Sequence, residues 1–285
     1  MSQTGKGSRT GRALIEQINR TEVPADGIAM WHLGQEGMAV KRGGRILYFD
    51  PFLSAELGGD MRRNFPPPLK PEEVTNADYV LISHDHLDHL DPYTLNGIGK
   101  SSPNARFICP APHTARLTEI GISEDRIIAA KVTEAIELEG IRIQPVACKH
   151  EEYFTDESGH HGFLGYILDM DGLVFYHAGD GLAVPELVEE LKKHPIEIAC
   201  LPINGHDFKR FGQNLMGNMT FREAADLADA VGAELVIPMH YDLFAANTEN
   251  PAYFVDYLHR AYPFQRFKMF VPGERMLYLS ERLPR

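Results

Sequence analysis

A run of three histidines and two aspartates, His84-Asp85-His86-Leu87-Asp88-His89, is the part of this sequence most suited to chemistry. It follows directly on the apolar segment 79–83, which we predict to be a buried strand. Imidazole and carboxylate groups are costly to bury without partners, and both are usual ligands of divalent metal ions. The run therefore predicts a metal site at the end of a strand.

Three further residues that can bind metal ions follow predicted strands later in the chain. His150 follows segment 141–148, Asp180 follows 173–177, and His240 follows 235–239. Strands that end at the same sheet edge can deliver such groups to one rigid site. The candidate ligands are then His84, His86, Asp88, His89, His150, Asp180 and His240. Seven ligands exceed what one tetrahedral ion binds, so we predict two ions that share a carboxylate and activate water.

The elements that must position these residues are predicted as many strands with interspersed helices. Strands are predicted over 28–33, 37–41, 45–49, 79–83, 106–109, 135–138, 141–148, 163–169, 173–177, 196–203, 235–239, 268–271 and 276–280. Helices are predicted over 14–20, 92–97, 112–121, 185–194, 220–231 and 251–261. Asp171-Gly172 predicts a hairpin turn, and Thr220 with Glu223 predicts a capping box. Because no linker-like gap interrupts the elements, we expect a flexible lead-in over residues 1–13 and a single domain over 14–285.

Composition limits the classes of partner. The 285 residues carry a net charge of −12, which argues against nucleic acid as a partner, because backbone binding needs clustered Lys and Arg. No run of 18 apolar residues is present, so we expect no membrane span. The three cysteines, Cys109, Cys148 and Cys200, each lie in or beside an apolar segment, and we expect reduced, buried thiols in a cytoplasmic protein.

The motif His-x-His-x-Asp-His, with a later His, Asp and His, resembles the signature of the metallo-β-lactamase-fold hydrolases. An early strand of that family ends in an Asp, which is matched here by Asp50 in the segment 48–52. Within the superfamily the chain most resembles the L-ascorbate-6-phosphate lactonase family, through segments 28–34, 175–180, 218–220 and 236–242. The resemblance extends from about Leu14 to the end of the chain.

The resemblance implies an α+β fold, a four-layer αββα sandwich of two mixed β-sheets with the site at one edge. It implies that His84, His86 and His150 hold the first metal ion and that Asp88, His89 and His240 hold the second. Asp180 would bridge the ions, and Asp50 would orient ligands. The resemblance also implies a homo-oligomer and Mn²⁺ as the bound metal, whereas a histidine-rich donor set suits Zn²⁺ as the alternative.

The reaction implied is attack of a metal-bound hydroxide on the carbonyl of a small, anionic substrate, a sugar-phosphate lactone. Asp88 or Asp180 would then protonate the leaving alkoxide. Predicted substrate contacts are Asn204, His206, Lys209, Arg210, Tyr153 and Tyr241. Lys209 and Arg210 are the candidates for binding an anion, although a solvated basic loop is the slightly better interpretation of both residues.

Three other functions remain open at this point. A phosphodiesterase of the same fold, acting on a nucleotide or a lipid head group, would use the same pair of metal ions. A non-catalytic metal-binding module would retain the fold, but the complete ligand set argues against it. A nuclease is disfavoured by the excess of acidic over basic residues and by the lack of an evident nucleic-acid-binding appendage.

Overall fold

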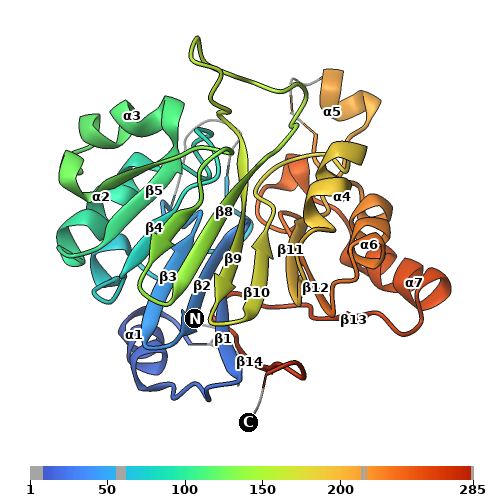
Figure 1. Ribbon diagram of the computed structural model, residues 1–285, viewed down its shortest axis with the longest axis horizontal. Helices are drawn as coiled ribbons and strands as arrows, with labels where there is room; N and C mark the ends of the chain where they lie inside the picture. The colour runs from blue at the N-terminus through green and yellow to red at the C-terminus, as the bar shows by residue number, and fades with distance from the viewer. Residues whose placement is uncertain (1–8, 56–61, 213–214, 216, 284–285) are drawn as a thin grey trace. The chain divides into compact units, whose positions relative to one another are not determined.

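The computed structural model describes residues 9–55, 62–212, 215 and 217–283, which form two compact units (Figure 1). Unit 1 comprises Met1–Ala129 and Phe270–Arg285, and unit 2 comprises Ala130–Met269. The sheets have seven strands each, in the orders β14-β1-β2-β3-β4-β5-β6 and β13-β12-β11-β10-β9-β8-β7. The single domain expected over 14–285 stays a prediction, and residues 1–8 of the expected lead-in lie outside the described part of the chain.

The sheet of unit 1 combines antiparallel and parallel pairs. Its strands are β1 (Gly27–Gly34), β2 (Gly37–Arg42), β3 (Arg45–Phe49), β4 (Tyr79–Leu81), β5 (Arg106–Pro110), β6 (Ile127–Ala130) and β14 (Arg275–Leu279). The strands β3, β4 and β5 are parallel, with Phe49 opposite Leu81. Since parallel strands end at the same edge, this register brings Asp50, just after β3, level with the residues that lead into His84.

Helices cover one face of the sheet in unit 1. They are α1 (Gly11–Arg20), α2 (Pro92–Ser101) and α3 (Thr114–Glu119), with short 3-10 helices at Pro71–Glu73, Ala111–His113 and Glu124–Arg126. The apolar face of α1, with Leu14 and Ile18, packs in one buried cluster with Leu95 and Ile98 of α2 and with Trp31 of β1. This packing fixes the outer layer over the strands that carry the histidine run.

Gly97, in the middle of α2, lies against Pro71, and we expect a Gly97→Ala variant to lose stability. A Cβ at this position would lie 2.3 Å from Cβ of Pro71, whose ring cannot move away. Overpacking costs about 1–3 kcal/mol, and a contact as short as this one belongs at the upper end of that range, above the gain of about 1 kcal/mol that Ala brings to a helix. The measurement is urea unfolding, with Gly212→Ala as the control, because no atom of the described residues beyond its chain neighbours lies within 4 Å of a Cβ there. An unchanged midpoint for Gly97→Ala would contradict the expectation.

The sheet of unit 2 is also mixed. Its strands are β7 (Ile136–Leu138), β8 (Ile141–Ala147), β9 (Leu164–Met170), β10 (Leu173–His177), β11 (Ile198–Pro202), β12 (Leu235–Met239) and β13 (Arg266–Phe267). The strands β10 to β13 are parallel, whereas β7 to β10 pair in antiparallel fashion. The hairpin turn predicted between β9 and β10 is confirmed, because Asp171 and Gly172 have φ values of 51° and 85°.

Four helices accompany this sheet. They are α4 (Pro185–Leu191), α5 (Phe208–Gly212), α6 (Phe221–Ala230) and α7 (Pro251–Ala261), with a 3-10 helix at Ala245–Asn247. The predicted capping box of α6 is confirmed, since Glu223 N donates to Thr220 Oγ1 and Thr220 N donates to Glu223 Oε2. In Figure 1 α6 and α7 lie together beside β11 and β12, and their apolar residues share one buried cluster with those strands.

The three cysteines are buried and none forms a disulfide, as the sequence predicted. In the described part of the chain, no helix combines the length and the apolar character needed to cross a membrane.

Three details of the fold differ from the sequence prediction. The strand predicted over 268–271 is wrong, because the pairing with β12 already ends at Phe267 and the chain then turns through Pro272 and Gly273. The strand β6 and the short helix α5 were not predicted. Both are too short for a periodic pattern to stand out.

Candidate metal centre

The histidine run of unit 1 forms one buried group at the carboxyl end of β4. The ring centroids of His84 and His86 lie 4.4 Å apart, and those of His84 and His89 lie 4.0 Å apart. His84, His89 and Asp88 are buried, whereas His86 is partly exposed. Neutral imidazoles packed this closely suit a shared cation better than a hydrophobic core.

Hydrogen bonds from Ser83 and Asp50 orient two of these histidines. Asp50 Oδ2 accepts from Ser83 Oγ at 2.6 Å and lies 2.9 Å from His89 Nδ1, and Asp50 Oδ1 accepts from Ser83 N at 2.7 Å. Because the Ser83 hydroxyl proton is directed to Asp50, its oxygen accepts from His84 Nδ1 at 2.9 Å. This network assigns the proton of both imidazoles to Nδ1. Nε2 of His84 and of His89 then carries the lone pair that a metal ion needs.

Asp88 accepts a hydrogen bond from a residue of the β1–β2 turn. Gln35 Nε2 donates to Asp88 Oδ2 at 2.8 Å, and the same oxygen lies 3.7 Å from His89 Nε2. The turn begins at Gly34, and Gln35 is itself buried in a left-handed conformation with φ of 57°. An amide donor at this oxygen stabilises the ionised form of a carboxylate and fixes its direction.

A second group of candidate ligands lies at one edge of the sheet in unit 2. The strands β8, β10, β11 and β12 run in the same direction, so the residues that follow them meet at that edge. Asp180 Oδ2 lies 3.6 Å from His150 Nε2 and 3.4 Å from His240 Nε2. Two ligands on a tetrahedral ion, each about 2.0–2.1 Å from the metal, are about 3.4 Å apart. The three side chains therefore have the spacing of groups that share a cation.

The backbone is strained at two residues of the candidate metal centre, one in each unit. Asp50 and His240 have φ values of 36° and 57°, in the left-handed region that residues other than glycine seldom adopt. Such conformations cost of order 1 kcal/mol or more and persist where the surroundings fix them. They direct the two side chains toward the edges described above.

The donor set fits divalent metal ions. All seven side chains predicted as ligands are imidazoles or carboxylates, and six of them are buried. Within unit 1 the candidate donor atoms of His84 and His86 lie within 4.8 Å of each other, as do those of Asp88 and His89, and within unit 2 those of His150 and Asp180. Groups of this type and spacing would bind Zn²⁺, Mn²⁺ or a similar ion.

Three of the predicted substrate contacts have distinct surroundings. Asn204 follows β11, between the strands that lead to Asp180 and His240, and its buried side chain donates to Asn247 Oδ1 at 3.0 Å. His206 is exposed, with Nε2 3.2 Å from Glu223 Oε2. Tyr241 belongs to the buried cluster beneath the helices of unit 2.

The predicted anion-binding pair lies in the helix α5, and Tyr153 lies in the loop that follows β8. The guanidinium of Arg210 pairs with Asp207 and donates to the carbonyl oxygen of Thr248 at 2.8 Å. Lys209 is exposed. Burial raises the pKa of Tyr153, with a further contribution from the Glu186 carboxylate, so its hydroxyl keeps its proton at neutral pH.

Sequence reasoning did not identify Ser83 and Gln35 as parts of the site. Ser83 precedes the histidine run directly, and a hydroxyl beside several imidazoles was the available signal. Gln35 lies about fifty residues earlier, and only the three-dimensional contact with Asp88 reveals its position.

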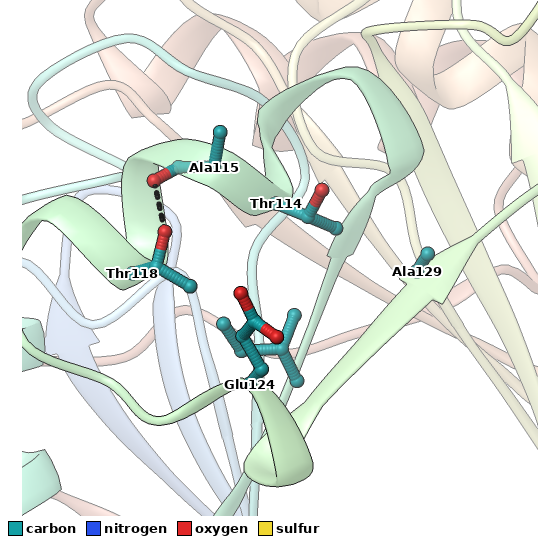
Figure 2. A pocket seen from close by; sticks show the side chains of 6 residues that line it. Thr114, Ala115, Thr118, Glu124 and Ala129 are labelled. Carbon is teal, nitrogen blue, oxygen red and sulfur yellow. Dashed lines mark hydrogen bonds between the residues drawn. The ribbon is translucent and has the colours of Figure 1, made fainter.

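A separate hollow of about 360 Å³ on unit 1 has no comparable chemistry. Figure 2 shows the side chains that line it, among them Thr114, Thr118 and Glu124. The Thr118 hydroxyl donates to the carbonyl oxygen of Ala115 at 2.7 Å. Glu124 is the only ionisable side chain among the described residues that line this hollow.

Comparison with known sequences agrees with the metal binding that the donor set indicates. A family profile described as "Beta-lactamase superfamily domain" matches residues 45–241 of this chain. A "UPF0173 metal-dependent hydrolase" from Nitratidesulfovibrio vulgaris (strain DP4) is 30% identical over 250 residues, which cover 86% of this chain and 93% of that protein.

Solved structures show the same fold. Igni18, described as a metallo hydrolase from Ignicoccus hospitalis, matches with a TM-score of 0.68 and 24% identity, over 90% of this chain and 100% of that one. The metallo-β-lactamase fold protein YhfI from Bacillus subtilis matches with a TM-score of 0.65 and 11% identity, over 89% and 100%. The predicted fold class, with two mixed sheets and flanking helices, is confirmed.

Proposed function

Since this chain belongs to the metallo-β-lactamase superfamily and, within it, to the UPF0173 metal-dependent hydrolases, we propose that it hydrolyses a lactone or a similar carboxylic ester. The observation that carries the proposal is the network around Asp50 and Ser83. It presents Nε2 of His84 and His89 as metal ligands, in a group that also contains a carboxylate. The sugar-phosphate lactone suggested by the sequence resemblance is one member of this class.

Seven residues would hold two divalent ions. From the sequence resemblance we assign His84, His86 and His150 to one ion, Asp88, His89 and His240 to the other, and Asp180 to both. The bound ions would lower the pKa of a water molecule and polarise the substrate carbonyl. Mn²⁺ is the metal that we favour from the sequence resemblance, and Zn²⁺ is the alternative.

The protein's own groups orient these ligands and supply a proton. Asp50 and Ser83 keep the two histidines in the tautomer that binds metal, and Gln35 fixes Asp88. Asp88 and Asp180 are the carboxylates able to pass a proton to the leaving alkoxide. Burial of both residues limits competition from bulk water at that step.

Metal removal tests the proposal directly. Purified protein would be analysed for metal content, stripped with a chelator, and reconstituted with Mn²⁺ or Zn²⁺. Each form would be assayed against a panel of lactones, carboxylic esters and phosphodiesters. We expect about two ions per chain and ester hydrolysis that is lost on stripping and restored by the metal.

Two outcomes would contradict the proposal. Full ester hydrolysis by metal-free protein would remove the role of the ions. Metal-dependent hydrolysis of phosphodiesters, with no activity on any ester, would favour the phosphodiesterase alternative.

A further inference from the structure

A cavity of about 550 Å³ in unit 2 opens beside the candidate ligand His150. Its volume falls within the range of small-molecule sites. Leu182, two residues after Asp180, also lines it. The cavity therefore borders the ligand group of unit 2, where the reacting bond of a substrate would lie under the function proposed above.

Two aromatic side chains of α5 give the cavity an apolar wall. Phe208 is 92% exposed and Phe211 is 74% exposed. They are three residues apart, so they lie on the same face of the helix, and both line the cavity. Large apolar side chains exposed together at a cavity indicate a surface that binds something apolar.

The charged groups around the cavity are carboxylates. Glu151, Glu152 and Asp207 line it, and the described lining residues include no Lys or Arg. The backbone N–H of Arg210, aided by its guanidinium, holds the pKa of Asp207 below its usual range, so this carboxyl is ionised at neutral pH.

Two of the three cations nearest in sequence, Lys149 and Arg210, are engaged by these carboxylates, whereas the third, Lys209, is exposed and does not line the cavity. Lys149 Nζ lies 3.7 Å from Glu152 Oε2, and the Arg210 guanidinium pairs with Asp207. A phosphate or carboxylate group in the cavity would therefore meet negative charge without a dedicated cation.

We propose that this cavity binds an uncharged, apolar acyl group, such as one that carries an aromatic ring, and that it selects against substrates that carry a negative charge there. The proposal rests on the esterase function proposed above and narrows its substrate class. It replaces the sugar phosphate expected from the sequence by a neutral, apolar ester or lactone.

Three 4-nitrophenyl esters test the proposal on the metal-loaded protein: the acetate, the phenylacetate and the 4-carboxyphenylacetate. We expect kcat/KM for the phenylacetate to exceed that for each of the other two at least tenfold. In a Phe208→Ala/Phe211→Ala variant, the ratio of phenylacetate to acetate should fall at least tenfold. In a Glu151→Gln/Glu152→Gln variant, discrimination against the carboxylate ester should weaken.

Phe264→Ala is the matched control, since Phe264 is 95% exposed and does not line the cavity. It should leave all three values unchanged. Equal or faster hydrolysis of the charged ester by the wild-type protein would overturn the inference and leave the esterase proposal standing. So would an unchanged ratio in the double Phe variant. If no ester is hydrolysed in a metal-dependent way, the proposed function fails and the inference fails with it.

Discussion

A His86→Ala variant is expected to fold normally and to lose at least about a thousandfold in kcat/KM, or ~4 kcal/mol of transition-state stabilisation. His86 lies against His84, with ring centroids 4.4 Å apart, and it is the least buried of the seven proposed ligands. Its truncation therefore leaves little buried volume unfilled, while it removes one donor from an ion. The measurement is steady-state hydrolysis of an ester that the wild-type protein cleaves, together with the metal content of the variant.

Circular dichroism and the melting temperature of the metal-free proteins serve as the check on folding. His259→Ala is the control, because His259 is an exposed histidine on α7 outside the ligand set. We expect this variant to keep its metal and its rate. Near-normal turnover by His86→Ala at low metal occupancy would refute the role given to this residue.

An Asp50→Asn variant is expected to bind metal about 10–100-fold more weakly, since loss of a residue that orients a ligand usually has this effect. Asn tolerates the left-handed backbone found at this position, so the main chain should be retained. An amide has only one acceptor oxygen, however, whereas Asp50 accepts through both oxygens from Ser83 and His89. The measurement is activity as a function of free metal concentration, and excess metal should restore much of the rate.

Asp78→Asn gives a matched control at the other end of the same pair of strands. Asp78 Oδ2 accepts from Ile46 N at 2.8 Å, and the residue lies just before β4. Its replacement should lower stability without a shift in metal dependence. A purely structural role for Asp50 would make the two variants behave alike.

Much of the architecture could be predicted from the sequence because the pattern of apolar segments is regular. Strands such as β10 and β12 are short, buried and bounded by turn residues, and the helix α7 begins and ends where Pro251 and Ala261 indicated. The candidate ligands follow strand ends, so a strand pattern was sufficient to locate them in the chain.

Other features depend on contacts that no local pattern records. The α5 helix spans five residues with two exposed phenylalanines, and the sequence alone suggested a basic loop around Lys209 and Arg210. Only the pairing of Arg210 with Asp207 shows that this cation is engaged. The bond from Gln35 to Asp88 likewise joins residues that are far apart in sequence.

The Ser83 hydroxyl has a consequence for how the protein acquires its metal. Its oxygen accepts from His84 Nδ1, and its proton is donated to the carboxylate of Asp50, which also contacts His89 Nδ1. Under the assignment above, these histidines serve different ions. Because one carboxylate would then orient a donor at each of the two sites, a substitution at Asp50 should weaken the affinity for both ions rather than for one.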